Sequence, residues 1–206
     1  MITATATMIE AMDSNDTLRE PEVTGDFRNG TIPVPITGIK GTLKFTYDGK
    51  TVTIKGDISN VPQGQHGFHI HTSPFTGQKC RESGPHYNPH NVRAHSAQLF
   101  YHHGCIYAKK LFPIVENKPL SVHFPLQKSH GRPEDTERHV GDLGNIHSSD
   151  SWGITKVNVQ DSIINLKEGD INSILNRTVV IHQLPDFFNS SSIGPRIACG
   201  IIMKGK

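Results

Sequence analysis

Short segments in which apolar and polar residues alternate recur along the chain. The ranges 41–47 and 51–58 both alternate in this way, and Asp48 with Gly49 between them forms a strong hairpin signal. Further strand candidates are the ranges 67–71, 153–159, 162–166, 177–182 and 196–202. No long segment shows helical periodicity. The pattern therefore predicts an all-β domain, built as a β-sandwich or a Greek-key barrel.

Two parts of the chain lack this alternation. Residues 1–31 are polar without a clear period, which predicts a disordered or weakly ordered extension before a domain at 32–206. Residues 73–150 contain few strand signals. A loop of that length inside a compact domain is unusual, and we expect one part of it to be functional and another part to be foreign to the fold.

Composition narrows the function classes. The net charge of +2 gives no broad basic surface, so we expect no nucleic-acid partner. Neither a membrane-spanning run nor a secretory signal is present in the sequence, which predicts no membrane partner and a cytoplasmic protein. A leader missing from the gene model would instead make it extracellular. The chain contains 13 histidines, and histidine is the commonest metal ligand.

His69 and His71 lie on one predicted strand, where a period of two places both imidazoles on the same face. They could share a metal ion, or they could be two polar residues on a solvent face. The remaining residues decide between these readings. They are His86 in a Gly-Pro-His-Tyr-Asn-Pro run, His130, the run Arg-His-Val-Gly-Asp at 138–142, His182, Asp186, and Arg196 shortly before Cys199.

With these motifs the sequence resembles the copper/zinc superoxide dismutase family over residues 38–203, apart from one insert. The resemblance implies an eight-stranded Greek-key β-barrel or sandwich, with a long zinc loop, a shortened electrostatic loop, one copper ion and one zinc ion per chain. The implied copper ligands are His69, His71, His86 and His182, and the implied zinc ligands are His86, His130, His139 and Asp142. The chemistry agrees, because four imidazoles suit Cu(II) and imidazoles with one carboxylate suit structural Zn²⁺.

The resemblance also implies an activity, the disproportionation of superoxide, and the residues that carry it. His86 would bridge both metals and exchange a proton, and Arg196 would attract the superoxide anion. Asp186 would orient one ligand from each metal, although a plain turn residue after Pro185 is the alternative. Cys80 and Cys199 would form a disulfide. The alternative function is a catalytically weak or inactive relative that binds metal for copper delivery or storage.

Residues 92–127 depart from the family pattern, because they separate His86 from His130 where the family has a short loop. Codons for Val92 and Arg93 can begin like an intron donor, and Gln127 can be CAG, the usual acceptor end. We favour a translated retained intron on grounds of loop length. The alternative is a genuine insertion that binds a further metal or a partner. The insert carries Cys105, the odd cysteine.

Two further departures concern rate and assembly. The loop between His182 and Arg196 is short and lacks the charged residues that guide the anion in the family, which predicts a slower and less salt-sensitive enzyme. The family implies a homodimer and delivery of copper by a chaperone. Lys204 stands where an apolar dimer contact is expected, which argues against the dimer.

Overall fold

The computed structural model describes residues 1–11, 38–92, 131–149, 153–188 and 194–205. These residues are almost entirely in strands and in the loops that join them. The elements in chain order are β1 (Ile2–Glu10), β2 (Lys40–Tyr47), β3 (Val52–Ser59), β4 (Gly64–His71), the 3-10 helix η2 (Cys80–Ser83), β5 (Asp142–Ser148), β6 (Ile154–Asp161), β7 (Thr178–His182), β8 (Arg196–Ile201) and β9 (Met203–Lys204).

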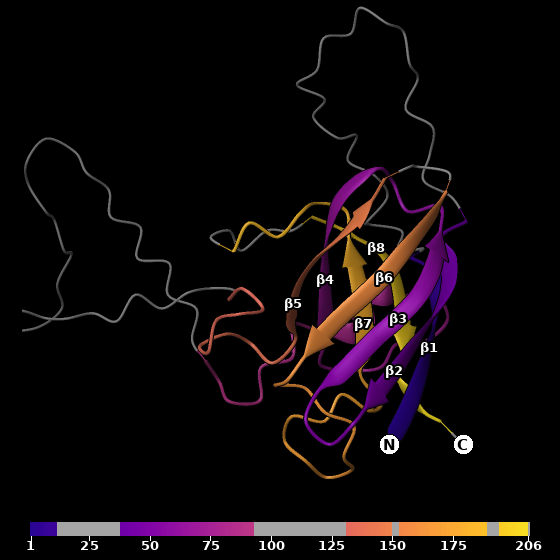
Figure 1. Ribbon diagram of the computed structural model, residues 1–206. Coiled ribbons are helices and arrows are strands. Elements are labelled where there is room, and N and C mark those ends of the chain that lie inside the picture. The colour runs from indigo at the N-terminus through magenta and orange to yellow at the C-terminus, as the bar shows by residue number, and fades with distance from the viewer. Residues whose placement is uncertain (12–37, 93–130, 150–152, 189–193, 206) are drawn as a thin grey trace, which may run out of the picture.

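The strands form one antiparallel sheet in the order β5-β4-β7-β8-β1-β2-β3-β6, with the short β9 paired to β1. The terminal strands β5 and β6 contact each other, so the sheet curves into a nearly closed barrel (Figure 1). Three connections between these strands cross this seam, namely β3 to β4, β5 to β6 and β6 to β7, and the first and last of them skip intervening strands and give the Greek-key topology. The predicted all-β, eight-stranded Greek-key barrel is confirmed.

Alternation along the strands sends apolar side chains into the barrel. Leu43 and Phe45 of β2, Ile54 of β3, and Phe68 and Ile70 of β4 are all fully buried. Burying each such side chain contributes about 1.5–3 kcal/mol of hydrophobic free energy. Because Phe68 and Ile70 point inward, the alternating residues His69 and His71 of β4 point to the opposite face of the sheet.

The hairpin between β2 and β3 follows the predicted turn. The Oδ1 atom of Asp48 accepts hydrogen bonds from the backbone amides of Lys50 and Thr51, both at 2.8 Å. Gly49 has a φ of 107°, a conformation that other residues rarely adopt. The turn thereby fixes the register in which Tyr47 pairs with Val52.

The prediction of a disordered N-terminal extension is wrong for its first part, since Ile2–Glu10 forms β1. Ala4, Ala6 and Met8 point inward and are buried, while threonines alternate with them on the outer face. Alanine contributes little hydrophobic signal, and this explains why the alternation was not recognised. Residues 12–31, the remainder of the predicted extension, lie outside the described residues.

Two strand assignments also needed correction. The predicted strand at 162–166 is a turn, because Oδ1 of Asp161 accepts the backbone amides of Ile163 and Ile164 at 2.7 and 2.9 Å. Ile164 is nevertheless fully buried, so the apolar residues at 162–166 indicate packing against the core and not a strand. Strand β5 was not predicted, since Gly144 and Asn145 interrupt its apolar alternation.

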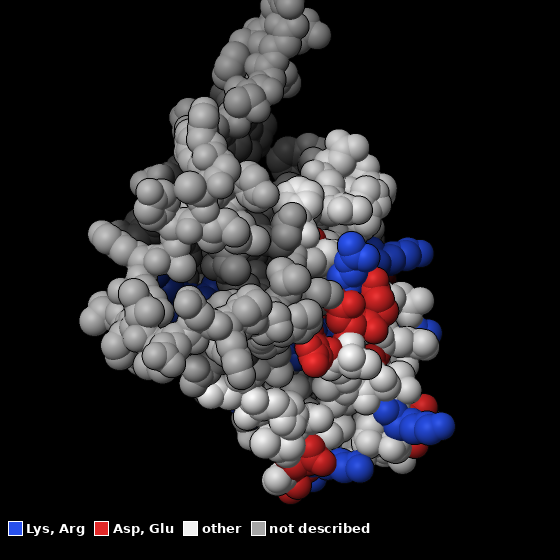
Figure 2. Space-filling model, turned by 90° about the vertical axis from the view of Figure 1, so that its left-hand side faces the viewer, with Lys and Arg blue, Asp and Glu red and all other residues white. Residues whose placement is uncertain are grey.

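Charged groups of both signs lie close together on the described part of the face seen in Figure 2. In the described part of the chain, no helix is long and apolar enough to span a membrane.

Candidate metal centre

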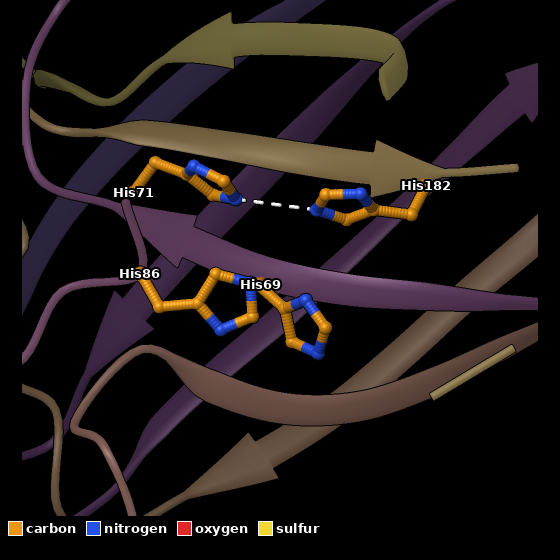
Figure 3. Close-up of side chains that lie close together, drawn as sticks. All are labelled: His69, His71, His86 and His182. Carbon is orange, nitrogen blue, oxygen red and sulfur yellow. Dashed lines mark hydrogen bonds between the residues drawn. The ribbon is translucent and has the colours of Figure 1, made fainter. Parts of the chain in front are cut away.

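Four histidines that are far apart in the sequence come together at one side of the barrel. His69 and His71 lie on β4, His182 ends β7, and His86 follows η2 and forms an isolated bridge with His71. One ring nitrogen from each of the four residues lies within 4.8 Å of the others, and the rings gather around a common centre (Figure 3). Three of these side chains are buried and His86 is nearly so.

Hydrogen bonds to backbone carbonyls indicate which nitrogens of His71 and His182 carry protons. Nδ1 of His71 lies 2.7 Å from the carbonyl oxygen of Gly84, and Nδ1 of His182 lies 3.2 Å from that of Gly194. Burial, and then the neighbouring imidazoles and Arg196, lower the pKa of His71 and of His182 well below the usual value, so both rings are neutral near pH 7. A carbonyl can only accept, and each Nδ1 therefore holds the proton. Each Nε2 is therefore unprotonated and offers a lone pair that can coordinate a metal ion.

His69 is oriented by a carboxylate instead of a carbonyl. Its Nε2 lies 2.9 Å from Oδ2 of Asp186, and both side chains are fully buried. Asn145 fixes Asp186 in turn, because its side-chain amide donates to the Asp186 carbonyl at 2.9 Å and accepts the Asp186 amide at 2.7 Å. The Asp186 carboxylate leaves Nδ1 of His69 as the nitrogen available to a metal. Nothing in the sequence pattern indicated Asn145.

A second group of potential ligands comprises His86, His139 and Asp142, whose ligand atoms also lie within 4.8 Å of one another. Nδ1 of His86 lies 2.8 Å from Oδ1 of Asp142, and Nδ1 of His139 lies 3.5 Å from Oδ2. The backbone amides of Gly131 and His139 also donate to Oδ2, at 3.2 and 3.1 Å. His130, the remaining zinc ligand implied by the sequence, lies outside the described residues.

His86 belongs to both groups. Its Nδ1 faces Asp142 in the second group, and we infer that Nε2 serves the first. The ring centroid of His86 lies 4.1 Å from that of His69 and 6.2 Å from that of His139, which places the ring between the groups. One imidazole in this position can contact two cations.

Arg196 lies beside the first group on a scaffold of carbonyl oxygens. Its Nη1 donates to Cys80 and Arg81 at 2.9 and 2.7 Å, and its Nη2 donates to Gly84 at 2.7 Å. These acceptors belong to η2 and its C-terminal end, which the buried disulfide between Cys80 and Cys199 ties to β8. The disulfide implied by the family resemblance is present.

The donor sets fit the two expected metals. The first group offers imidazole nitrogens alone, which suits copper, and the second combines imidazole with a carboxylate, which suits zinc. Two bare Nε2 atoms, those of His71 and His182, face each other at 3.2 Å, an arrangement that a cation beside both would stabilise. The fold and these donor sets define a β-barrel protein with a histidine-rich two-metal centre.

Comparison with known proteins agrees with this class. The family model for copper/zinc superoxide dismutase matches residues 39–107 and 117–202, more than half of the chain. An extracellular Cu-Zn superoxide dismutase of Caenorhabditis elegans is 34% identical over 84% of this chain. The matched part spans 63% of that relative's length. Superoxide dismutase [Cu-Zn] 2 of Mesembryanthemum crystallinum is also 34% identical, over 80% of this chain and 86% of its own length. The chain belongs to the copper/zinc superoxide dismutase family.

A solved structure, that of the clock protein EA4, superposes with a TM-score of 0.61 at 23% identity. The alignment covers 98% of this chain and 93% of that one. At this identity the similarity bears on the fold alone, and it agrees with the barrel described above.

Proposed function

We propose that this chain is a superoxide dismutase that holds copper at His69, His71, His86 and His182 and zinc at His86, His130, His139 and Asp142. Two superoxide anions and two protons give one dioxygen and one hydrogen peroxide. Copper, when bound, supplies the reversible one-electron couple that accepts an electron from one anion and returns it to the next. Zinc is assigned a structural role.

His86 is proposed to handle the proton. Its Nδ1 is engaged at Asp142, so Nε2 is the atom that can take a proton in one half of the cycle and return it in the other. His71 and His182 are held in one tautomer by the Gly84 and Gly194 carbonyls, and they therefore stay as fixed electron-pair donors. Among the residues that the structure describes, His86 alone belongs to both groups, which supports its choice over the other three imidazoles.

Arg196 is proposed to attract and orient the anion. Its charge is felt at both His71 and His182, whose pKa values it helps to lower. Three hydrogen bonds to backbone carbonyls fix the guanidinium, so little ordering is needed when superoxide arrives. A fixed positive charge beside the neutral rings of His71 and His182 favours a small anion over neutral molecules of the same size.

The sharing of His86 by the two ligand groups is the observation that carries this proposal. The test uses the full chain, purified and loaded with copper and zinc, in a superoxide dismutation assay with and without cyanide. We expect cyanide-sensitive activity that is lost in His86→Ala. Metal binding at the expected stoichiometry without dismutation would instead favour the alternative role in copper delivery or storage.

Four expectations from the sequence stay predictions. They are the homodimer, the delivery of copper by a chaperone, the cytoplasmic location and the foreign origin of the insert at 92–127. Sedimentation of the metal-loaded chain tests the first, and fractionation of cells that express it tests the third. One 34%-identical relative is named an extracellular enzyme, so fractionation must include the culture medium.

A further inference from the structure

Arg138 is a buried cation that neither ligand group uses directly. The residue is 5% exposed, and its Nη2 forms an ion pair with the carboxylate of Asp161, which is itself 5% exposed. Its Nη1 donates to the carbonyl oxygen of Asp142 at 2.7 Å, with longer contacts to those of His139 and Val140 at 3.3 and 3.4 Å. One guanidinium thus holds the backbone of two candidate zinc ligands.

The same side chain contacts the segment that follows His130. A Cβ atom placed on Gly131 would lie 2.1 Å from Cβ of Arg138, so the two backbones pack directly together only because residue 131 is a glycine. The Gly131 amide in turn donates to Oδ2 of Asp142 at 3.2 Å. Arg138 therefore lies against both parts of the chain that frame the second ligand group.

Asp161 anchors this arrangement to the barrel. It is the last residue of β6, and its Oδ1 accepts the amides of Ile163 and Ile164 at 2.7 and 2.9 Å. Ile164 is fully buried in the core. The position of the Asp161 carboxylate is thus set by the barrel and not by the metal-binding segment, and Arg138 transmits that position to residues 139–142.

A buried ion pair is a poor source of stability, because removing both charges from water offsets most of their attraction. Its better-attested role is to specify one arrangement among several. We propose that Arg138 and Asp161 are positioning residues that hold His139 and Asp142 in zinc-binding geometry before the ion arrives, and so strengthen zinc binding. This inference rests on the proposed zinc site and adds residues that do not touch the metal.

The test measures zinc affinity of the metal-free full chain by competition with a chelator, for the wild type, Asp161→Asn and Arg138→Lys. Copper affinity is measured on the same preparations, and Co²⁺ absorption reports the geometry of the zinc group. Glu168→Gln is the control, because it removes an exposed ion pair with Lys204 that lies away from both ligand groups. The free energy of unfolding of each metal-free variant is recorded alongside.

We expect zinc affinity to fall about 10- to 100-fold in Asp161→Asn, the usual effect of losing a partner of a metal-holding group. Arg138→Lys keeps the positive charge but cannot donate to Asp161 and to the Asp142 carbonyl from two separate nitrogens. Its zinc affinity is expected to lie between those of the wild type and Asp161→Asn. Copper affinity and the Glu168→Gln control should stay at the wild-type level, and the Co²⁺ spectrum of Asp161→Asn should broaden or shift.

Wild-type zinc affinity in Asp161→Asn would overturn the inference and leave the proposed function standing. A parallel loss of zinc and copper affinity that follows the unfolding free energy would also overturn it, because that pattern belongs to general destabilisation. A wild-type chain that binds copper but no zinc would overturn the proposed zinc site itself, and the inference with it.

Discussion

The Nε2 atoms of His71 and His182, on the paired strands β4 and β7, face each other at 3.2 Å. Each ring donates its Nδ1 proton to a different backbone carbonyl, so neither can donate to the other. Two lone pairs directed at each other repel unless a cation lies between them. The metal-free protein should therefore respond to acid in a way that the metal-bound protein does not.

Acid should destabilise the metal-free chain as pH falls below about 6.5, where imidazoles in the unfolded state begin to take up protons. The pKa values of His71 and His182 are lowered in the folded state, first by burial, so the unfolded state binds more protons there. Stability from these two groups is full above that pH, and each loses up to about 1.4 kcal/mol per pH unit below it. Denaturant unfolding of the chelated protein across this range measures the slope.

Replacing His71 by Asn is the matched comparison for this slope, since it removes one of the two depressed imidazoles and leaves the other. The variant should lose stability less steeply between about pH 6.5 and pH 5 than the wild type. Equal slopes in the two proteins would show that His71 does not need to stay neutral for the chain to fold.

Asp186→Asn should weaken copper binding, by about 10- to 100-fold. The carboxylate only accepts, which keeps the proton of His69 on Nε2; an amide can present a donor there and reverse the tautomer. Copper affinity by competition with a chelator is the measurement. Asp170→Asn serves as control, because Asp170 accepts from Asn165 and Asn172 in a loop away from the ligand groups. Unchanged copper affinity in Asp186→Asn would contradict the orienting role.

Salt should slow the proposed superoxide dismutation by this chain less than that by a relative with a charged loop beside the site. In the described part of the loop after β7, Leu184 is 47% and Phe187 is 65% exposed, so apolar side chains lie where charges would guide the anion. Phe187→Lys should raise kcat/KM at low ionic strength and steepen its decline with added salt.

Phe187→Gln is the matched control for that experiment, as it removes the ring without adding charge. Its kcat/KM should keep the shallow salt dependence of the wild type. A wild-type rate that already falls steeply between low and physiological ionic strength would disprove the expectation that guidance is weak.

Loss of the disulfide should lower the free energy of unfolding by about 2–5 kcal/mol, because the bond closes a long loop in the unfolded chain. Cys80 and Cys199 are 119 positions apart in the sequence. Chemical unfolding of a double Cys→Ser variant at these positions, beside oxidised wild type, measures the loss. We also expect a lower kcat/KM, because Arg196 donates to the Cys80 carbonyl. A variant of unchanged stability would show that β8 holds η2 without the bond.

Joining Asn91 to Lys128 should leave metal content unchanged if residues 92–127 are foreign to the fold. The reason is that the barrel, η2 and residues 131–149 position the described ligands without them. Zinc and copper analysis of the two chains checks this. Sequencing the mature transcript separately decides the retained-intron reading, since a dominant message with these codons intact would exclude it.

Much of the barrel could be predicted because its central strands alternate strongly and Asp48 with Gly49 specify their hairpin. Strand β1 was missed because its inward residues include small alanines, and β5 because Asn145 and Gly144 serve the site and the turn beside it. In β5, residues needed for the site therefore interrupt the alternation of apolar and polar residues that would predict a strand. Conversely, Ile164 is buried as a core residue of a loop, which periodicity alone does not distinguish from a strand.

The sequence indicated which histidines belong together, but only the structure indicates which of their atoms face one another. Sequence spacing placed His69 and His71 on one face, as β4 shows. The carbonyl oxygens of Gly84 and Gly194 accept the hydrogen bonds that fix which nitrogen of His71 and of His182 is protonated. The position of a backbone carbonyl cannot be inferred from the type of residue that carries it. Asn145 was overlooked for the same reason, since it acts on the backbone of Asp186.

One oxygen atom, the carbonyl of Gly84, accepts from both His71 and Arg196. Gly84 has a φ of 74°, which a side chain would disfavour, so this orientation of the peptide depends on the absence of one. The imidazole proposed to bind copper and the cation proposed to attract the substrate are thus both oriented by a single peptide group. Neither can be retuned in evolution or in the laboratory by moving that peptide without disturbing the other.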